Sequence, residues 1–160
     1  MEKISVLFVC LGNICRSPTA HAVFEAKVRA AGLDQHIVID SAGTGDWHIG
    51  VAPDKRATAA ASGRGYDMTP LRARQVQHDD FERFDYILAM DSQNFTDLKR
   101  LAPRQFDGHL SLFLDFHPQV SSRDVPDPYY GSDDGFNQVL DLVEVTSDAL
   151  LVHLRSAHGF

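Results

Sequence analysis

Residues 6–18 read Val6-Leu7-Phe8-Val9-Cys10-Leu11-Gly12-Asn13-Ile14-Cys15-Arg16-Ser17-Pro18. The apolar run has the composition of a buried strand, and it ends at Cys10. Gly12 and Asn13 then indicate a short loop, and Ser17 followed by proline is typical of the first turn of a helix. The stretch therefore predicts a strand, a loop and a helix in succession, with the thiol of Cys10 near the N-terminus of the helix.

The loop has the features of an anion-binding site. Five residues separate Cys10 from Arg16, so the chain can close around the sulfur with the guanidinium beside it. Gly12 tolerates any backbone angle and Asn13 tolerates the left-handed region, so successive N–H groups can point inward. The helix N-terminus, Arg16 and a hydrogen bond from Ser17 favour the thiolate of Cys10. The same loop would bind phosphate, with Arg16 contacting two oxygens, so the nucleophile and the phosphate site coincide.

The pattern Cys-x5-Arg-Ser after an N-terminal strand resembles that of the low-molecular-weight protein tyrosine phosphatases. The resemblance continues in chain order through Asp40-Ser41-Ala42-Gly43-Thr44, Trp47-His48, Tyr86-Ile87-Leu88-Ala89-Met90-Asp91 and Asp127-Pro128-Tyr129-Tyr130. It implies a phosphotyrosine phosphatase I-like, Rossmann-like fold. It also implies hydrolysis of protein phosphotyrosine and small aryl phosphates through a cysteinyl-phosphate, without a metal or another cofactor.

The composition limits the class of protein. A chain of 160 residues that is 44% hydrophobic can form one well-packed domain, which we expect over residues 1–160. A formal charge of -7 argues against nucleic-acid binding, and no window approaches the ~20 apolar residues of a membrane span. The two cysteines lie in one loop and do not resemble a disulfide framework, which favours the reducing cytoplasm.

Alternating strand and helix patterns predict an α/β fold with a four-stranded parallel twisted sheet and helices on both faces. We expect strands at residues 4–9, 36–40, 86–90 and 110–114, and helices at residues 17–31, 53–62, 78–83 and 92–101. A last helix should follow a cap formed by Ser132-Asp133-Asp134 and reach residue 153 or beyond. Residues 116–131 form a long connection, which indicates a functional loop.

Phosphate-ester hydrolysis would take two steps, attack by the Cys10 thiolate and then hydrolysis by water, with Arg16 stabilising the charge in both. Cys10 alone could be a small core residue, but Arg16 at this spacing favours a nucleophile. The leaving group needs a proton from a carboxylic acid elsewhere in the chain. Asp127 is the candidate, although local sequence equally allows an ordinary Asp-Pro loop dipeptide. The resemblance implies Asp127 rather than Asp124 as the general acid and base.

The remaining site residues are expected to bind or support the substrate. Trp47, Tyr129 and Tyr130 are candidate walls for an aromatic ring, with core packing as the alternative for each. The phosphate would contact the loop residues Leu11, Gly12, Asn13, Ile14, Cys15 and Ser17.

The resemblance also implies supporting contacts. Ser41 would hydrogen-bond Asn13 and hold its unusual backbone, and Asp91 would cap a helix while ordering the site. Cys15 would form a reversible disulfide with an oxidised Cys10. Leu71 departs from some relatives, which carry a histidine there, so the polar network around that position must differ.

Other functions remain open. An arsenate reductase of this fold would need further cysteines, and none follows Cys15. Related protein arginine phosphatases tend to have Thr where this chain has Ile14. A non-catalytic oxyanion-binding module would need neither Cys10 nor Asp127. The expected partners are phosphotyrosine proteins, a cognate tyrosine kinase, and inorganic phosphate as product and competitive inhibitor. The eight histidines show no metal-ligand spacing.

Overall fold

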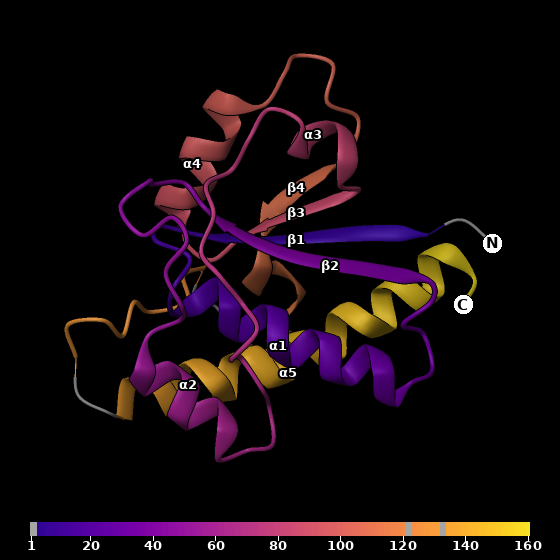
Figure 1. The fold of residues 1–160 in the computed structure, drawn as a ribbon. Coiled ribbons are helices and arrows are strands. Elements are labelled where there is room, and N and C mark those ends of the chain that lie inside the picture. Colours follow the sequence, from indigo (N-terminus) through magenta and orange to yellow (C-terminus); the bar gives the residue numbers. More distant parts are fainter. Residues whose placement is uncertain (1–2, 121–122, 132–133) are drawn as a thin grey trace.

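A computed structural model describes residues 3–120, 123–131 and 134–160, in which four parallel strands form one sheet in the order β2-β1-β3-β4 (Figure 1). The fold class predicted from the sequence is confirmed. The elements are β1 (Ile4–Cys10), α1 (Arg16–Ala30), β2 (Ile37–Gly43), α2 (Lys55–Ser62), α3 (Asp80–Arg83), β3 (Tyr86–Ala89), α4 (Ser92–Leu101), β4 (His109–Leu112), the 3-10 helix η1 (Phe113–Phe116) and α5 (Asp134–His158).

The first strand lies in the middle of the sheet, as its continuous apolar composition predicts. β1 pairs with β2 on one side and with β3 on the other, both in parallel. Residues 6–9 are fully buried, because helices cover the sheet on both faces. The central strand therefore delivers Cys10 to the carboxyl edge of the sheet, where ligands bind in such folds.

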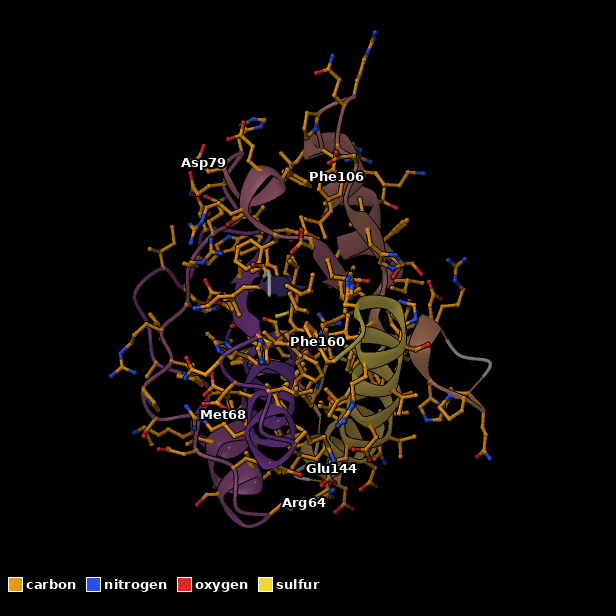
Figure 2. All side chains as sticks on the ribbon, turned by 90° about the vertical axis from the view of Figure 1, so that its right-hand side faces the viewer. Arg64, Met68, Asp79, Phe106, Glu144 and Phe160 are labelled. Atoms are coloured by element: carbon orange, nitrogen blue, oxygen red, sulfur yellow. The ribbon has the colours of Figure 1, made fainter. Side chains whose placement is uncertain are left out.

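One face of the sheet is covered by α1, α2 and α5 (Figure 1). Its packing centres on Phe8, whose ring centroid lies 5.7 Å from that of Phe24 in α1 and 5.3 Å from that of Phe113. Figure 2 shows Arg64, just after α2, beside Glu144 of α5, with which it forms an ion pair. This face thus holds the two long helices against the strand that carries Cys10.

The opposite face is covered by the shorter helices α3 and α4. Leu98 of α4 is fully buried there against Leu7 and Val9 of β1. The rings of Phe81 and Phe106 meet edge to face, with centroids 5.4 Å apart. None of the helices within the described ranges has both the length and the apolar character that crossing a membrane requires.

Two strand boundaries differ from the prediction by more than one residue. β2 continues to Gly43 because residues 41–43, whose composition indicates a turn, pair with residues 8–10 of β1. β4 ends at Leu112, and Phe113 and Leu114 belong to η1 instead of extending the strand. Both are buried in the core beside Phe8, and a straight strand would carry one of the two to the opposite face. Tertiary packing therefore overrides the local strand composition.

The helix ends follow local capping chemistry. Gly32 takes φ +72° directly after the last turn of α1, which is the left-handed position that glycine favours. The carboxylate of Asp91 accepts a hydrogen bond from the backbone N–H of Asn94 at 2.7 Å and caps α4 as predicted. α2 begins at Lys55 under an Asp54 cap, two residues after the expected start at Pro53. The expected cap of α5 falls on Ser132 and Asp133, which lie outside the described residues.

Candidate active site

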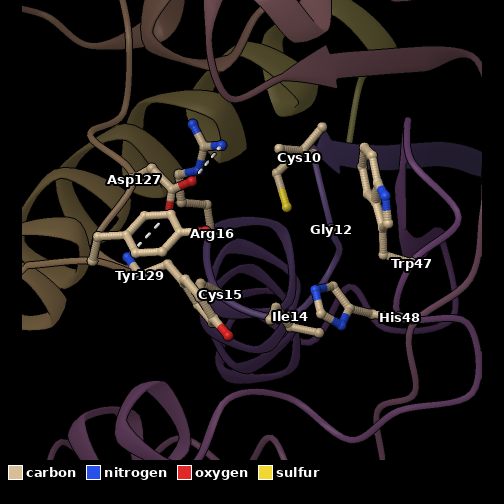
Figure 3. Close-up of a pocket in the computed structure, with 11 residues that line it drawn as sticks. Cys10, Gly12, Ile14, Cys15, Arg16, Trp47, His48, Asp127 and Tyr129 are labelled. Atoms are coloured by element: carbon tan, nitrogen blue, oxygen red, sulfur yellow. Dashed lines mark hydrogen bonds and ion pairs between the residues drawn. The ribbon is translucent and has the colours of Figure 1, made fainter.

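A cavity of about 410 Å³ opens beside the carboxyl end of β1 (Figure 3). It brings together residues from the first loop, from the loop after β2, and from the loop before α5, which are far apart in the sequence. The sequence-predicted residues that line it are Cys10, Leu11, Gly12, Ile14, Cys15, Arg16, Trp47, Asp127, Tyr129 and Tyr130. Asn13, Ser17, Ser41 and Asp91 lie behind this lining.

Cys10 is 3% exposed, and its sulfur points into the cavity in Figure 3. Sγ lies 3.0 Å from Oγ of Ser17 and accepts a hydrogen bond from the backbone N–H of Asn13 at 3.3 Å. The side-chain amide of Asn13 donates to the same Ser17 oxygen at 2.7 Å, so the single hydroxyl proton of Ser17 has two acceptors within reach, the sulfur at 3.0 Å and the carbonyl oxygen of Ala42 at 3.4 Å. These donors can stabilise a thiolate that has little contact with water.

Asn13 has φ 56°, the one positive φ of a non-glycine residue in the described part of the chain. Its side-chain oxygen accepts a hydrogen bond from the backbone N–H of Arg74 at 3.0 Å. The expected hydrogen bond from Ser41 is wrong, because Oγ of Ser41 contacts Nδ1 of His21 at 3.0 Å. Ser41 pairs in register with Phe8, so its side chain faces α1 instead of the loop.

Gly12 and Gly43 allow the loop between Cys10 and Arg16 to lie close to the neighbouring segments. Gly12 does not have a positive φ, and the left-handed residue of the loop is Asn13. A Cβ there would lie 2.9 Å from Cδ2 of His48, which also lines the cavity. A Cβ on Gly43 would lie 2.6 Å from the carbonyl oxygen of Leu11. Sequence reasoning missed His48 and Gly43 as site residues, although both belong to motifs that carry the resemblance, Trp47-His48 and Asp40-Ser41-Ala42-Gly43-Thr44.

Arg16 is held from two sides in the first turn of α1, with its side chain 4% exposed. Its Nη1 donates to Oδ2 of Asp91 at 2.6 Å and to the carbonyl oxygen of Val125 at 3.1 Å. Nη2 lies 3.6 Å from Oδ2 of Asp127. Burial opposes the guanidinium charge, but the sulfur of Cys10 and the carboxylates of Asp91 and Asp127 outweigh it and raise the pKa of Arg16. The guanidinium is therefore charged and fixed in orientation.

The two candidate carboxylates of the late loop have different surroundings. Asp127 lines the cavity, with its side chain 43% exposed, and Oδ1 accepts a hydrogen bond from the backbone N–H of Tyr129 at 3.1 Å. Asp124 instead accepts hydrogen bonds from the backbone N–H and the hydroxyl of Ser92, at 2.8 and 2.7 Å. Of the two, Asp127 is the one that a bound substrate could contact.

Aromatic side chains form the rim of the cavity. Trp47 is 67% exposed, and its ring lies against Gly45, where a Cβ would come within 1.8 Å of it. The rings of Tyr129 and Tyr130 meet edge to face, with centroids 4.9 Å apart. The guanidinium of Arg56 lies 5.6 Å from the centre of the Tyr129 ring. These exposed faces are available to a flat substrate group.

Cys15 is buried in the same loop. Burial, followed by the negative charges of Asp54, Cys10 and Asp127, raises the pKa of the Cys15 thiol to about 12. It is therefore a neutral thiol at physiological pH, which makes Cys15 a poor nucleophile. Both cysteines are free, and the expected disulfide between them stays a prediction.

A buried ion pair supports the loop from behind, and sequence reasoning missed it. Asp80 is 1% exposed and accepts hydrogen bonds from both terminal nitrogens of Arg74, at 3.0 and 2.9 Å. Arg74 in turn supplies the backbone N–H that holds Asn13, and its carbonyl accepts from the N–H of Gly43. Leu71, which stands where some relatives carry a histidine, packs half-buried against the apolar core. The polar network around the loop therefore depends on Arg74 and Asp80.

Replacing Asp80 with alanine is expected to lower the free energy of unfolding by about 2 kcal/mol, because the partly buried guanidinium of Arg74 is then left with the more exposed Asp40 as its ion-pair partner. Urea unfolding followed by circular dichroism measures the change. Asp79→Ala removes a neighbouring exposed carboxylate that makes no capping bond and should cost less than about 0.5 kcal/mol. Equal losses in the two variants would contradict the role given to the ion pair.

Comparisons with known proteins agree along nearly the whole chain. Residues 5–158 match the family described as "Low molecular weight phosphotyrosine protein phosphatase". A low molecular weight protein-tyrosine-phosphatase of Streptomyces coelicolor is 46% identical over 153 residues, which is 94% of this chain and 93% of that protein. The crystal structure of a protein tyrosine phosphatase from Entamoeba histolytica has a TM-score of 0.93 and 38% identity, covering 97% of this chain and 99% of that one. The crystal structure of a Drosophila arginine phosphatase has a TM-score of 0.88 and 30% identity, covering 94% and 97%.

Proposed function

The chain belongs to the low molecular weight phosphotyrosine protein phosphatase family, and from this premise we propose that it hydrolyses phosphotyrosine in proteins through a phosphoryl intermediate on Cys10. The observation that carries the proposal is the lining of a single cavity by the Cys10 sulfur, the Arg16 guanidinium and the Asp127 carboxylate. These are a nucleophile, a cation for the phosphoryl oxygens, and a proton donor.

In the first step, the thiolate of Cys10 attacks phosphorus on the side opposite the ester oxygen. A sulfur–phosphorus bond forms while the bond to the phenolic oxygen breaks, and Asp127 passes its proton to the departing phenolate. Arg16 and the inward N–H groups of the loop bind the three oxygens that carry the negative charge. The close contact of Arg16 with Asp91 supports this role, because it orients the guanidinium before the substrate arrives.

In the second step, water hydrolyses the cysteinyl-phosphate. Asp127, now a carboxylate, takes a proton from the water as it attacks phosphorus, and the sulfur leaves as a thiolate. The hydrogen bond from the Asn13 N–H and the contact with Ser17 stabilise that thiolate, so they help the sulfur both to attack and to leave. Inorganic phosphate is released and Asp127 is again protonated.

The walls of the cavity favour an aryl phosphate. Cys10 is nearly inaccessible, whereas Trp47 and Tyr130 are highly exposed, so a long side chain is needed to reach the sulfur from the rim. A phenyl ring can pack against these aromatic faces, which phosphoserine cannot do. Ile14 makes the lining apolar at the position where we expect threonine in arginine phosphatases. Because one similar structure is that of an arginine phosphatase, phosphoarginine is the substrate to compare.

The partners follow from this chemistry. Phosphotyrosine proteins are the substrates, which a tyrosine kinase must supply. Inorganic phosphate would occupy the same loop as the substrate phosphoryl group and inhibit competitively. Two free thiols, one of them the nucleophile, suit a reducing compartment such as the cytoplasm.

The proposal is tested by hydrolysis of para-nitrophenyl phosphate at about pH 5–6 with EDTA present. One peptide carrying phosphotyrosine, phosphoserine or phosphoarginine at the same position then tests the substrate class. We expect kcat/KM for phosphotyrosine to exceed the other two by at least about 100-fold. Faster release of phosphate from phosphoarginine would make the protein an arginine phosphatase, and phosphate binding without turnover would make it a binding module.

Replacing Asp127 with asparagine is expected to lower kcat/KM, which reports the first step alone, about 10³-fold for phenyl phosphate and only about 10-fold for para-nitrophenyl phosphate. The second leaving group is more acidic, so it depends less on a proton donor. Steady-state kinetics over a series of substituted phenyl phosphates measures the difference. Asp124→Asn changes a carboxylate in the same loop and should alter both rates less than about threefold. An equal loss for all leaving groups would rule out Asp127 as the acid.

A further inference from the structure

A second hollow, of about 310 Å³, lies next to the active-site cavity. We call it the flanking hollow. Trp47 and Leu11 line both hollows and form the ridge between them. Beyond the ridge, the flanking hollow is lined by Thr44, Gly45, Asp97, Arg100 and Leu101. Figure 1 shows the two segments that enclose it, the loop after β2 and helix α4.

The ridge is held in place by its contacts. The ring of Trp47 lies directly on Gly45, where no side chain larger than hydrogen would leave room for it. The backbone N–H of Gly45 donates to the carbonyl oxygen of Leu11 at 2.9 Å, which ties the loop after β2 to the phosphate-binding loop. The side chains of Leu11 and Trp47 are nevertheless 41% and 67% exposed. A substrate seated in the active-site cavity therefore has a preformed apolar surface beside it.

The far wall of the flanking hollow comes from the last turn of α4. Leu101 is 39% exposed and adds a third apolar side chain to those of Leu11 and Trp47. Nη1 of Arg100 lies 3.7 Å from Oδ1 of Asp97, so the two charges at this wall largely balance. A charged side chain entering the hollow would lose water without meeting an uncompensated opposite charge, whereas an apolar side chain would meet three exposed apolar faces.

We propose that the flanking hollow is a specificity subsite that binds an apolar side chain near the phosphotyrosine of a protein substrate. This inference rests on the proposed function, because phosphotyrosine must occupy the neighbouring cavity. The two hollows are separated by one layer of side chains, and an extended peptide advances about 3.3 Å per residue. The bound residue therefore lies about two or three positions from the phosphotyrosine.

The test uses phosphotyrosine peptides with serine at all flanking positions, into which one leucine or one glutamate is placed at each position in turn. The measurement is kcat/KM, with free phosphotyrosine and para-nitrophenyl phosphate as substrates that do not extend past the ridge. We expect leucine at one position, two or three residues from the phosphotyrosine, to raise kcat/KM about tenfold over serine. Absence of such a position, or a preference for glutamate, would overturn the apolar subsite.

The variant Leu101→Ser changes the flanking hollow without touching the ridge. We expect it to reduce the leucine preference to less than about twofold and to leave hydrolysis of the two small substrates unchanged. Val152→Ser is the matched control, because Val152 is 67% exposed on α5, and it should keep the full preference. A preference that survives Leu101→Ser would place the subsite elsewhere. Failure to hydrolyse free phosphotyrosine would instead contradict the proposed function itself.

Discussion

Replacing Cys10 with serine is expected to lower kcat for para-nitrophenyl phosphate by more than about 10⁴-fold. A serine hydroxyl is a much weaker nucleophile than a thiolate. The other cysteine in the cavity cannot substitute, because the pKa of Cys15 is raised to about 12 and its thiol stays protonated. Steady-state kinetics with a sensitive phosphate assay measures the residual rate.

The same variant should still bind the product. The loop N–H groups and Arg16 remain, and removing the negative sulfur removes a repulsion toward phosphate, so we expect phosphate affinity equal to or tighter than that of the native protein. Isothermal titration calorimetry measures this directly. Loss of turnover with retained phosphate binding separates the chemical role of Cys10 from the folding of the loop.

Cys15→Ser is the matched control, because it makes the same thiol-to-hydroxyl change in the same loop. We expect it to lose less than about tenfold in kcat. An acid quench of the native protein during turnover should also trap a phosphoryl group on the peptide that contains Cys10. A Cys10→Ser variant with more than a few per cent of native activity would mean that another group attacks phosphorus.

Replacing Arg16 with lysine is expected to lower kcat/KM for para-nitrophenyl phosphate about 10³-fold. Lysine keeps the positive charge but is a single ammonium group. It cannot hold Asp91 at 2.6 Å and the Val125 carbonyl at 3.1 Å while presenting two further donors to phosphate oxygens. We expect both a lower kcat and weaker phosphate binding, because Arg16 contacts the phosphoryl group before and during the transfer.

The control for this substitution lies on the same helix. Arg29 is in the last turn of α1, its side chain is 67% exposed, and its ion pair is with Glu25. Arg29→Lys should therefore leave kcat/KM within about twofold of the native value. If Arg16→Lys behaved like Arg29→Lys, the positive charge alone would suffice, and the fixed planar geometry of Arg16 would have no catalytic role.

Local patterns were sufficient to predict most of the architecture. The continuous apolar run before Cys10 predicted a central parallel strand, and the capping residue Asp91 predicted the start of α4. They failed at Phe113, because a residue with strand composition can also fill a core position from a 3-10 turn. Strand length at β2 was also underestimated, because residues 41–43 pair with β1 despite their turn-like composition.

Some features of the candidate site could likewise be predicted from the sequence, and others could not. The resemblance, read residue by residue, named most of the side chains that line the cavity, including Asp127 over Asp124. It gave His48 no role in the site, did not identify the Arg74–Asp80 pair behind the loop, and assigned Ser41 the wrong partner. Ser41 and its partner His21 are well separated along the chain, and Arg74 and Asp80 are six residues apart in a stretch too polar to assign from its pattern. Neither spacing nor composition carries a local signal for these contacts.

Local sequence is enough to specify the order of elements, the short loop between Cys10 and Arg16, and the type of chemistry that a thiol, a guanidinium and a carboxyl can perform. These depend on backbone preferences and on functional groups, which are properties of single residues and near neighbours. The groups that hold Asn13 and Arg16, and the second hollow that α4 and the loop after β2 enclose beside Trp47, follow from tertiary packing instead. Such contacts arise because helices pack on the two faces of the sheet, which brings distant segments together at the ends of its strands.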